Sequence, residues 1–104
     1  MDKIVCDFNA IPWSETTVGV RSKSFTQSGK TLRLAEFTDE FVEEGWCTKG
    51  HAGYVLEGEL EIDFDGTIKK LKAGDGLAIP AGDKYKHKAT VLSKKARLIL
   101  VEDI

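Results

Sequence analysis

The chain has 104 residues, of which 41% are hydrophobic and 31% charged, and its formal net charge is −2. This length and composition are typical of one globular domain with its own hydrophobic core, so we expect residues 1–104 to form a single domain. The nearly balanced charge argues against a nucleic-acid-binding protein. No apolar run reaches the roughly 18 residues that a membrane span needs, and we expect neither nucleic acid nor a membrane as a partner.

The N-terminal third carries only weak strand signals. Residues 1–20 hold scattered apolar side chains without a clean period, and Pro12 favours an extended backbone at Ile11. Residues 18–25 alternate weakly and residues 31–37 alternate clearly. We expect an arm and an edge strand in residues 1–29, followed by the core of the domain in residues 30–104. Alternation places Arg33 and Glu36 on opposite faces of a strand and does not decide which of them faces the interior.

The clearest strand pattern lies between residues 46 and 72. Residues 52–56 are apolar on both faces, as in a strand covered on both sides, and residues 59–65 alternate strictly after a bend at Glu57-Gly58. Asp65-Gly66 is a strong signal for a two-residue hairpin turn. Folding the chain at this turn predicts the strand register, which pairs Glu59 with Lys72, Leu60 with Leu71, Glu61 with Lys70 and Ile62 with Lys69.

The C-terminal third predicts three more strands. They cover residues 77–79, 84–89 and 96–102, with a tight turn at Pro80. Three lysines alternate with Tyr85 and His87 in the second of them, and because ammonium groups favour water we expect Tyr85 and His87 to point inward. About eight short strands with regular turn signals and no convincing helix indicate an all-β sandwich or barrel.

Two stretches resemble the cupin superfamily. GYVLEGEL, residues 53–60, is similar to the end of the first cupin motif, and GDGLAIPAG, residues 74–82, is similar to the second. The resemblance covers roughly residues 30–102. It implies an all-β, cupin-type double-stranded β-helix, that is, a jelly-roll barrel, here preceded by an N-terminal strand or arm. This fold hosts many chemistries, so the resemblance alone does not identify a function.

The residues at the family's metal-binding positions differ from the usual three histidines and one glutamate. His51 stands at the position of the glutamate, Tyr85 stands at the histidine position of the second motif, and the histidine pair of the first motif is absent. His87 follows Tyr85 by two residues and therefore lies on the same expected face. The usual iron or manganese site of the family cannot be carried over intact.

Cys47, His51 and His87 are the remaining candidates for metal ligands. A thiolate and two imidazoles suit zinc better than iron or manganese and leave a fourth position open. On a straight strand Cys47 and His51 would lie roughly 13 Å apart, so a shared ion requires a bend at residues 48–50, which Gly50 permits. The alternative is a pocket without metal, in which the histidines are hydrogen-bonded and Cys47 packs as a small apolar side chain.

Three functions are compatible with this pattern. The first is a small single-domain cupin that binds a small polar ligand, with or without a metal ion, in a pocket lined by Trp46, His51, Tyr85 and His87. The second is a metal-dependent enzyme of the isomerase, lyase or dioxygenase type, with Cys47, His51 and His87 as ligands and Tyr85 as the candidate acid or base. The third is a role in assembly with a filled interior. The missing histidine pair favours the first.

Further expectations concern reactivity and partners. Cys47 and His51 could form a thiol–imidazole pair, but the sequence identifies no third group that would orient the imidazole. A homodimer is predicted by the outward apolar side chains at Ala52, Tyr54, Leu56, Ile99 and Val101. The sequence shows no secretory signal and no CxxC pair, so we expect a cytoplasmic protein with reduced cysteines.

Overall fold

The structure is a computed structural model that describes residues 3–103 of the chain. Its strands are β1 (Ser14–Thr17), β2 (Val20–Gln27), β3 (Lys30–Thr38), β4 (His51–Glu57), β5 (Glu59–Asp63), β6 (Ile68–Lys72), β7 (Gly76–Ile79), β8 (Lys88–Val91) and β9 (Lys95–Asp103). Two short 3-10 turns, η1 (Phe8–Ala10) and η2 (Asp83–Tyr85), complete the elements. Among these described residues, no helix has the length and apolar character to cross a membrane.

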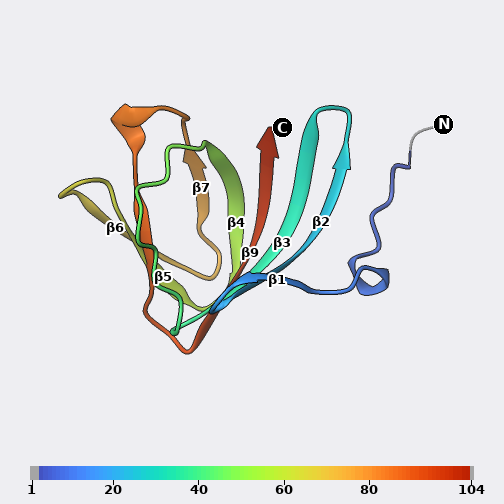
Figure 1. The fold of residues 1–104 in the computed structure, drawn as a ribbon, viewed down its shortest axis with the longest axis horizontal. Coiled ribbons are helices and arrows are strands. Elements are labelled where there is room, and N and C mark those ends of the chain that lie inside the picture. The colour runs from blue at the N-terminus through green and yellow to red at the C-terminus, as the bar shows by residue number, and fades with distance from the viewer. Residues whose placement is uncertain (1–2, 104) are drawn as a thin grey trace.

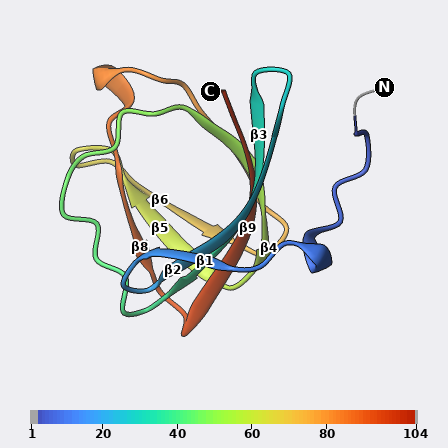
Figure 2. The same cartoon turned by 45° about the vertical axis from the view of Figure 1, so that its right-hand side comes forward.

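The strands form two antiparallel sheets that face each other (Figure 1). The larger sheet has six strands in the order β1-β2-β3-β9-β4-β7, and the smaller has three in the order β6-β5-β8. Figure 2 shows the same two layers from a second direction, with the N-terminal segment outside them, where Nζ of Lys23 on β2 donates to the carbonyl of Phe8. The predicted all-β class is confirmed, and the architecture is a two-layer β-sandwich.

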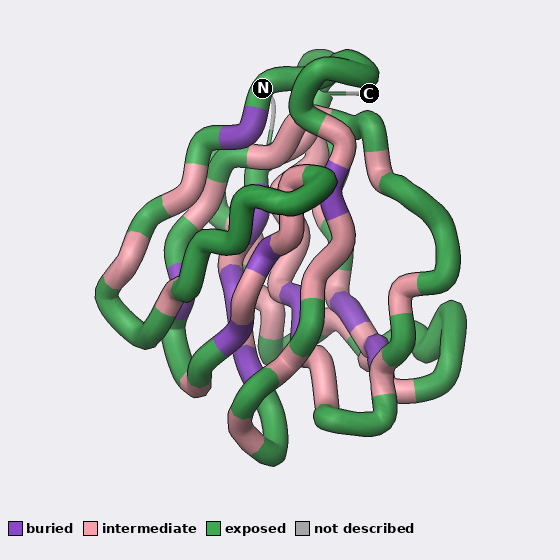
Figure 3. Tube along the Cα trace, turned by 90° about the vertical axis from the view of Figure 1, so that its left-hand side faces the viewer, coloured by how far each residue is buried: buried purple, intermediate pink, exposed green. Residues whose placement is uncertain are grey.

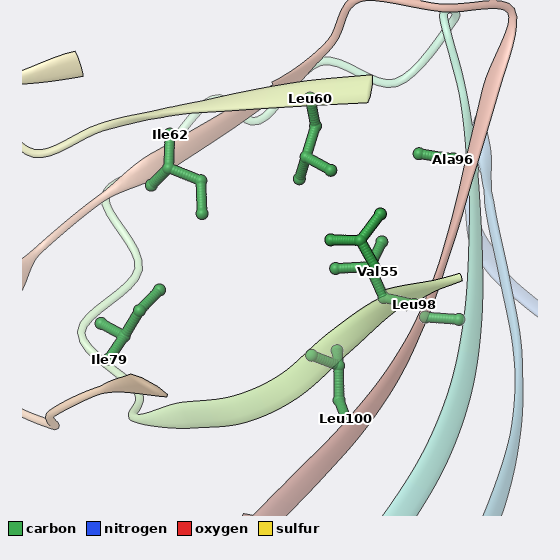
Figure 4. Close-up of a cluster of buried hydrophobic side chains, with 8 residues drawn as sticks. Val55, Leu60, Ile62, Ile79, Ala96, Leu98 and Leu100 are labelled. Carbon is green, nitrogen blue, oxygen red and sulfur yellow. The ribbon is translucent and has the colours of Figure 1, made fainter. Parts of the chain in front are cut away.

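The hydrophobic core lies between the inner faces of the two sheets (Figure 4). Val55 of β4, Ala35 of β3 and Ala96 of β9 are completely buried. Leu60 and Ile62 of β5 close the cluster from the other sheet. Burying each large aliphatic side chain contributes roughly 1.5–3 kcal/mol. In β2, β5 and β9, buried positions alternate mainly with partly buried ones, and most turn residues are exposed (Figure 3).

The hairpin between β5 and β6 has the predicted register. Glu59 pairs with Lys72, Leu60 with Leu71, Glu61 with Lys70 and Ile62 with Lys69. Asp65 and Gly66 both have positive φ, 58° and 110°, as the predicted turn requires. The bend at Gly58 is also confirmed, with φ of 85°. A side chain there would collide with the backbone of Lys95 and Ala96, so only glycine fits this position.

The prediction of a strand over residues 84–89 is wrong in its first half. Residues 83–85 form η2, in which the N–H of Tyr85 donates to the carbonyl of Gly82 at 3.1 Å, and β8 begins only at Lys88. The alternating lysines reflect a solvent-exposed segment rather than a pleated one. The predicted inward orientation of Tyr85 fails for the same reason, since its side chain is 36% exposed and Lys84 lies over its ring.

The outer face of the larger sheet carries a network of charged side chains. Glu36 of β3 is 6% exposed and accepts hydrogen bonds from Nε of Arg21 at 2.9 Å and Nε of Arg97 at 2.8 Å. The indole of Trp13 lies over this network, 4.2 Å from the guanidinium carbon of Arg21. Burial acts to raise the pKa of Glu36, but the hydrogen bonds and charges of the two arginines outweigh it and hold the pKa below its ordinary value.

Candidate metal centre

Three segments bring Cys47, His51 and His87 together. Cys47 precedes β4, His51 is its first residue, and His87 precedes β8. The backbones of Cys47 and His87 pair with each other through two hydrogen bonds of 2.9 and 3.0 Å. One ligand atom from each of the three side chains lies within 4.8 Å of the others. The sequence left open whether these residues converge on an ion, and the structure places their ligand atoms close enough to share one.

The backbone bends between Cys47 and His51, as a shared site requires. Sγ of Cys47 lies 3.5 Å from Nε2 of His51, far closer than a straight strand would allow. The carbonyl of Thr48 accepts a hydrogen bond of 2.9 Å from the N–H of Gly82. Gly50 packs so closely on the turn after β7 that an added Cβ would lie 2.9 Å from the nitrogen of Ala81. The bend is therefore held by contacts with that turn.

His87 is 4% exposed and its imidazole has a defined orientation. Nδ1 lies 3.0 Å from the carbonyl oxygen of Tyr85. A carbonyl only accepts hydrogen bonds, so Nδ1 carries the proton and the lone pair of Nε2 stays available. The ring also lies edge-on to His51, with centroids 5.4 Å apart, and 5.8 Å from the ring of Phe64. Tyr85 thus serves this site through its backbone rather than its side chain.

His51 is bonded to a carboxylate that the sequence did not identify as part of the site. Nδ1 of His51 lies 2.6 Å from Oε2 of Glu102 near the end of β9, and Glu102 accepts two hydrogen bonds of 2.9 Å from Arg33. Of Arg33 and Glu36, it is therefore Arg33 that faces the interior. The missed signal was the alternation of residues 96–102, which puts Glu102 on the same face as the core residues Leu98 and Leu100.

Burial and neighbouring charges set the ionisation of this pair. Burial lowers the pKa of His51, and the charge and hydrogen bond of Glu102 offset that effect only in part. Burial alone would raise the pKa of Glu102, but the hydrogen bonds and charge of Arg33, together with His51, hold it below its ordinary value. Near neutral pH these shifts favour a neutral imidazole, the form that binds metals, beside an ionised carboxylate.

A hollow of about 1400 Å³ opens beside the three side chains. Its walls include the core residues Leu60, Ile62, Leu98 and Leu100, while Cys47, His51, His87, Arg33 and Glu102 supply polar groups. Trp46 and Tyr85, both predicted to line the pocket, are not among its lining residues. Trp46 is 38% exposed, and its ring faces Nζ of Lys86 and Lys88 at 5.3 and 4.7 Å.

The three donors fit the requirements of a divalent ion. Zinc bonds of about 2.0–2.1 Å to nitrogen and 2.3 Å to sulfur place tetrahedral ligand atoms roughly 3.5 Å apart, which matches the distance between Cys47 and His51. Ligating histidines usually donate their other N–H to a carboxylate or a backbone carbonyl, and both imidazoles do so here. Within residues 3–103 these three side chains form the one group of this kind.

A comparison with protein families assigns the fold. The family model described as a cupin domain matches residues 48–102, which is more than half of the chain. The chain belongs to the cupin family. The match includes His51 and His87 and begins one residue after Cys47.

Known relatives of this cupin agree with the assignment. The uncharacterised protein YdbB of Bacillus subtilis (strain 168) is 35% identical over 80 residues, which cover 69% of this chain and 71% of that protein. The structure of KdgF from Halomonas sp. is similar with a TM-score of 0.77 at 18% identity, covering 91% of this chain and 87% of that one. An RmlC-like cupin from Shewanella frigidimarina NCIMB 400 has a TM-score of 0.75 at 19% identity, covering 98% and 91%. At these identities the structural matches show the fold alone.

Proposed function

We propose that this cupin binds one divalent metal ion, with zinc favoured, through Cys47, His51 and His87. A small polar ligand then occupies the fourth position from the hollow between the sheets, the interior of the predicted jelly-roll barrel. The observation that carries this proposal is the convergence of the three ligand atoms within 4.8 Å. The arrangement resembles zinc sites with three protein ligands and one exchangeable position.

The donor chemistry supports zinc over iron or manganese. A thiolate is a soft ligand that suits zinc, whereas manganese and magnesium favour oxygen ligands. Cys47 must be reduced to bind, which fits the cytoplasmic location expected from the sequence. A bound zinc ion would supply a Lewis-acidic position for an oxygen or nitrogen atom of the ligand.

The hollow suggests the shape and polarity of the ligand. Apolar side chains such as Leu60, Ile62 and Leu100 form much of the wall, and a hydrogen-bonded group of polar side chains, Cys47, His51, Glu102 and Arg33, also lines it. Sites of this kind bury the apolar body of a ligand and fix its orientation with a few polar groups. We therefore propose a small organic ligand with one polar end directed at the metal centre.

Binding is favoured over metal-dependent catalysis because neither of two candidate proton-transfer groups, the Tyr85 hydroxyl and the Glu102 carboxylate, is free to act at the site. Tyr85, the candidate acid or base, lies in η2 outside the lining of the hollow. Glu102, the carboxylate that contacts the site, is held by Arg33 and His51. An isomerase, lyase or dioxygenase remains the alternative, and turnover of a polar substrate by the zinc-loaded protein would replace the binding proposal.

A second candidate function follows from the contact between Cys47 and His51. In the metal-free protein, Glu102 provides the third group that a thiol–imidazole pair needs for orientation. If Cys47 acts as a nucleophile, the metal-free protein should accumulate one acetyl group on Cys47 when mixed with p-nitrophenyl acetate. Peptide mass spectrometry would locate it, and equal labelling of Cys6 and Cys47 would exclude this function.

Elemental analysis of protein purified without chelators tests the metal proposal. We expect close to one zinc ion per chain in the wild type and in Cys6→Ala, a control that removes the other cysteine. We expect near-complete loss of zinc in Cys47→Ala and His87→Ala. Less than about a tenth of an ion per chain in the wild type, with unchanged stability after EDTA, would contradict the proposal.

We also propose a homodimer formed through the outer face of the larger sheet. Exposed apolar side chains on this face support it, since Tyr54, Leu56 and Val101 are 46%, 48% and 41% exposed. Light scattering at micromolar concentration should give the mass of two chains, and a Tyr54→Lys, Val101→Lys variant should give the mass of one. A monomeric wild type would contradict this part of the proposal.

A further inference from the structure

We infer that Arg33 and Glu102 form a positioning pair that fixes the imidazole of His51 for metal binding and holds Glu102 itself out of the coordination sphere. The inference deepens the proposed function, and its metal-binding part rests on it. Neither residue belongs to the three-ligand group. Both act through His51.

The contact between Glu102 and His51 sets which ring nitrogen is available. Oε2 of Glu102 lies 2.6 Å from Nδ1 of His51. An ionised carboxylate only accepts hydrogen bonds, so Nδ1 carries the proton and Nε2 keeps its lone pair. That same Nε2 lies 3.5 Å from Sγ of Cys47. The hydrogen bond on one side of the ring thus directs the metal-binding atom on the other side towards the site.

Arg33 holds Glu102 through both carboxylate oxygens. Nε of Arg33 donates to Oε1 and Nη2 donates to Oε2, each at 2.9 Å, and both side chains are largely buried. A two-point contact of this kind fixes the orientation of the carboxylate as well as its position. With Arg33 and His51 in place, hydrogen bonds engage both oxygens of Glu102.

Adjacent strands supply the three residues, so their spacing is set by the sheet rather than by loops. Arg33 lies on β3, Glu102 on β9 and His51 on β4, and these strands are neighbours in that order. Pairing of Ala52 with Val101 brings the inward positions 51 and 102 side by side. Sites built on regular elements hold their geometry better than sites built on loops.

Arg33 also explains how a carboxylate can lie beside a three-ligand site without becoming a fourth ligand. Zinc accepts carboxylate oxygens readily, and a free Glu102 would compete for the open position. The guanidinium of Arg33 balances the charge of the Glu102 carboxylate and donates a hydrogen bond to each of its oxygens. Loss of Glu102 should therefore leave the imidazole of His51 without a fixed orientation, whereas loss of Arg33 should free Glu102 to approach the metal. The zinc affinities of the two variants should therefore differ.

Zinc affinity of matched variants tests this inference. Competition against a chromogenic chelator would compare the wild type with Glu102→Ala, Glu102→Gln, Arg33→Met and the Arg33→Met, Glu102→Ala double variant. Glu36→Gln is the control, because Glu36 is also a buried glutamate between arginines, but on the outer face of the same sheet. We expect Glu102→Ala to weaken binding about 10–100-fold, the usual range for a residue that supports a ligand.

The other variants separate positioning from stability. Glu102→Gln should recover part of the affinity, because its amide oxygen can still accept from Nδ1 of His51. Arg33→Met should change zinc affinity in the wild-type background and have no further effect when Glu102 is already alanine. Glu36→Gln should stay within about twofold of the wild type. Equal losses in Glu102→Ala and Glu36→Gln would overturn the inference.

The tautomer of His51 in the metal-free protein gives a readout that does not depend on zinc. Long-range nitrogen–proton NMR spectra should show the Nδ1–H form in the wild type and in Glu36→Gln, and a loss of that form in Glu102→Ala. The Nε2–H form in the wild type would overturn the positioning pair whether or not zinc binds. A wild type that shows Nδ1–H but binds no zinc would contradict the proposed function and leave the orientation of His51 by Glu102 supported.

Discussion

The two faces of the six-stranded sheet carry two similar charged groups with different consequences. On the inner face Glu102 accepts two hydrogen bonds from Arg33 and one from His51. On the outer face Glu36 accepts one hydrogen bond each from Arg21 and Arg97. Both glutamates have a pKa below the ordinary value, with arginines as a main cause. What distinguishes them is the third partner.

The inner carboxylate contacts an imidazole that can bind a metal, whereas the outer one lies in a network beneath an indole ring. Trp13 lies over Arg21 and Lys23 at 4.2 and 4.8 Å, just before β1 begins. The outer group therefore joins the segment before β1 to strands β2, β3 and β9. A buried Glu–Arg pair alone does not identify a functional site, and the group that it orients decides its role.

The largest difference between variants of the two faces should be in zinc affinity, and it should appear when a candidate ligand is removed. His51→Ala deletes one of three donors and should weaken zinc binding by more than about 100-fold, beyond the range typical of supporting residues. Glu36→Ala, the outer-face counterpart, should leave zinc affinity nearly unchanged. Chelator competition measures both, and a similar affinity for His51→Ala and the wild type would remove His51 from the site.

Zinc should stabilise the folded protein, and this effect should depend on residues of the inner face of the sheet and not on those of the outer face. At a free concentration 100 times Kd, a ligand that binds only the folded state adds about 2.7 kcal/mol, which corresponds to a rise in Tm of roughly 10 °C for a domain of this size. Thermal unfolding with EDTA and with zinc measures this shift. The rise should persist in Glu36→Gln and vanish in His87→Ala, and an equal rise in both variants would place the ion elsewhere.

The outer network should contribute stability that depends on pH. Glu36→Gln replaces two charged hydrogen bonds, from Arg21 and Arg97, with weaker neutral ones. Because both arginines are partly exposed, we expect the free energy of unfolding at pH 7 to fall by about 1.5–3 kcal/mol in total. Because the pKa of Glu36 is lowered in the folded state, the advantage of the wild type is present above the ordinary pKa of about 4.5. It should shrink as the pH falls through the lower folded-state value.

Urea unfolding of the wild type and Glu36→Gln at pH 7 and pH 3 measures how the difference in their free energies of unfolding changes with pH. The difference between the two proteins should be larger at pH 7. A difference that grows on acidification would mean that the arginines do not stabilise the ionised form of Glu36.

The smallest effects should come from the two aromatic residues that the structure places outside the hollow. Tyr85→Phe keeps the carbonyl that accepts from His87, so zinc affinity should stay within about twofold of the wild type. Trp46→Ala removes exposed contacts with Lys86 and Lys88, worth about 0.5–1 kcal/mol each. A loss of zinc affinity beyond tenfold in Tyr85→Phe would restore its hydroxyl to the site.

The parts of the fold that local signals determine were predictable from the sequence. The β5–β6 register follows from the Asp65-Gly66 turn, because a two-residue loop leaves one way to pair the strands. The failure at residues 84–89 has a local cause as well. Alternating lysines imitate a strand, whereas the chain enters η2 from Gly82 with φ of 121°.

The candidate ligands were predictable from the sequence, but the residues that support them were not. Cys47, His51 and His87 are rare residue types framed by two motifs, and the bend at Gly50 was needed for them to meet. Glu102 reaches His51 only because β9 lies between β3 and β4, a pairing of distant strands that alternation within one strand cannot reveal. The same long-range pairing decides that Arg33 rather than Glu36 faces the interior.

Titration of the metal-free protein with cobalt(II) tests directly whether Cys47, His51 and His87 bind a metal ion. Cobalt replaces zinc in tetrahedral sites and reports a bound thiolate through its absorption spectrum. We expect saturation at one equivalent, with a tetrahedral spectrum and a thiolate-to-cobalt charge-transfer band that Cys47→Ser loses and Cys6→Ser retains. An octahedral spectrum without that band, or no saturable binding, would contradict a metal centre at Cys47, His51 and His87.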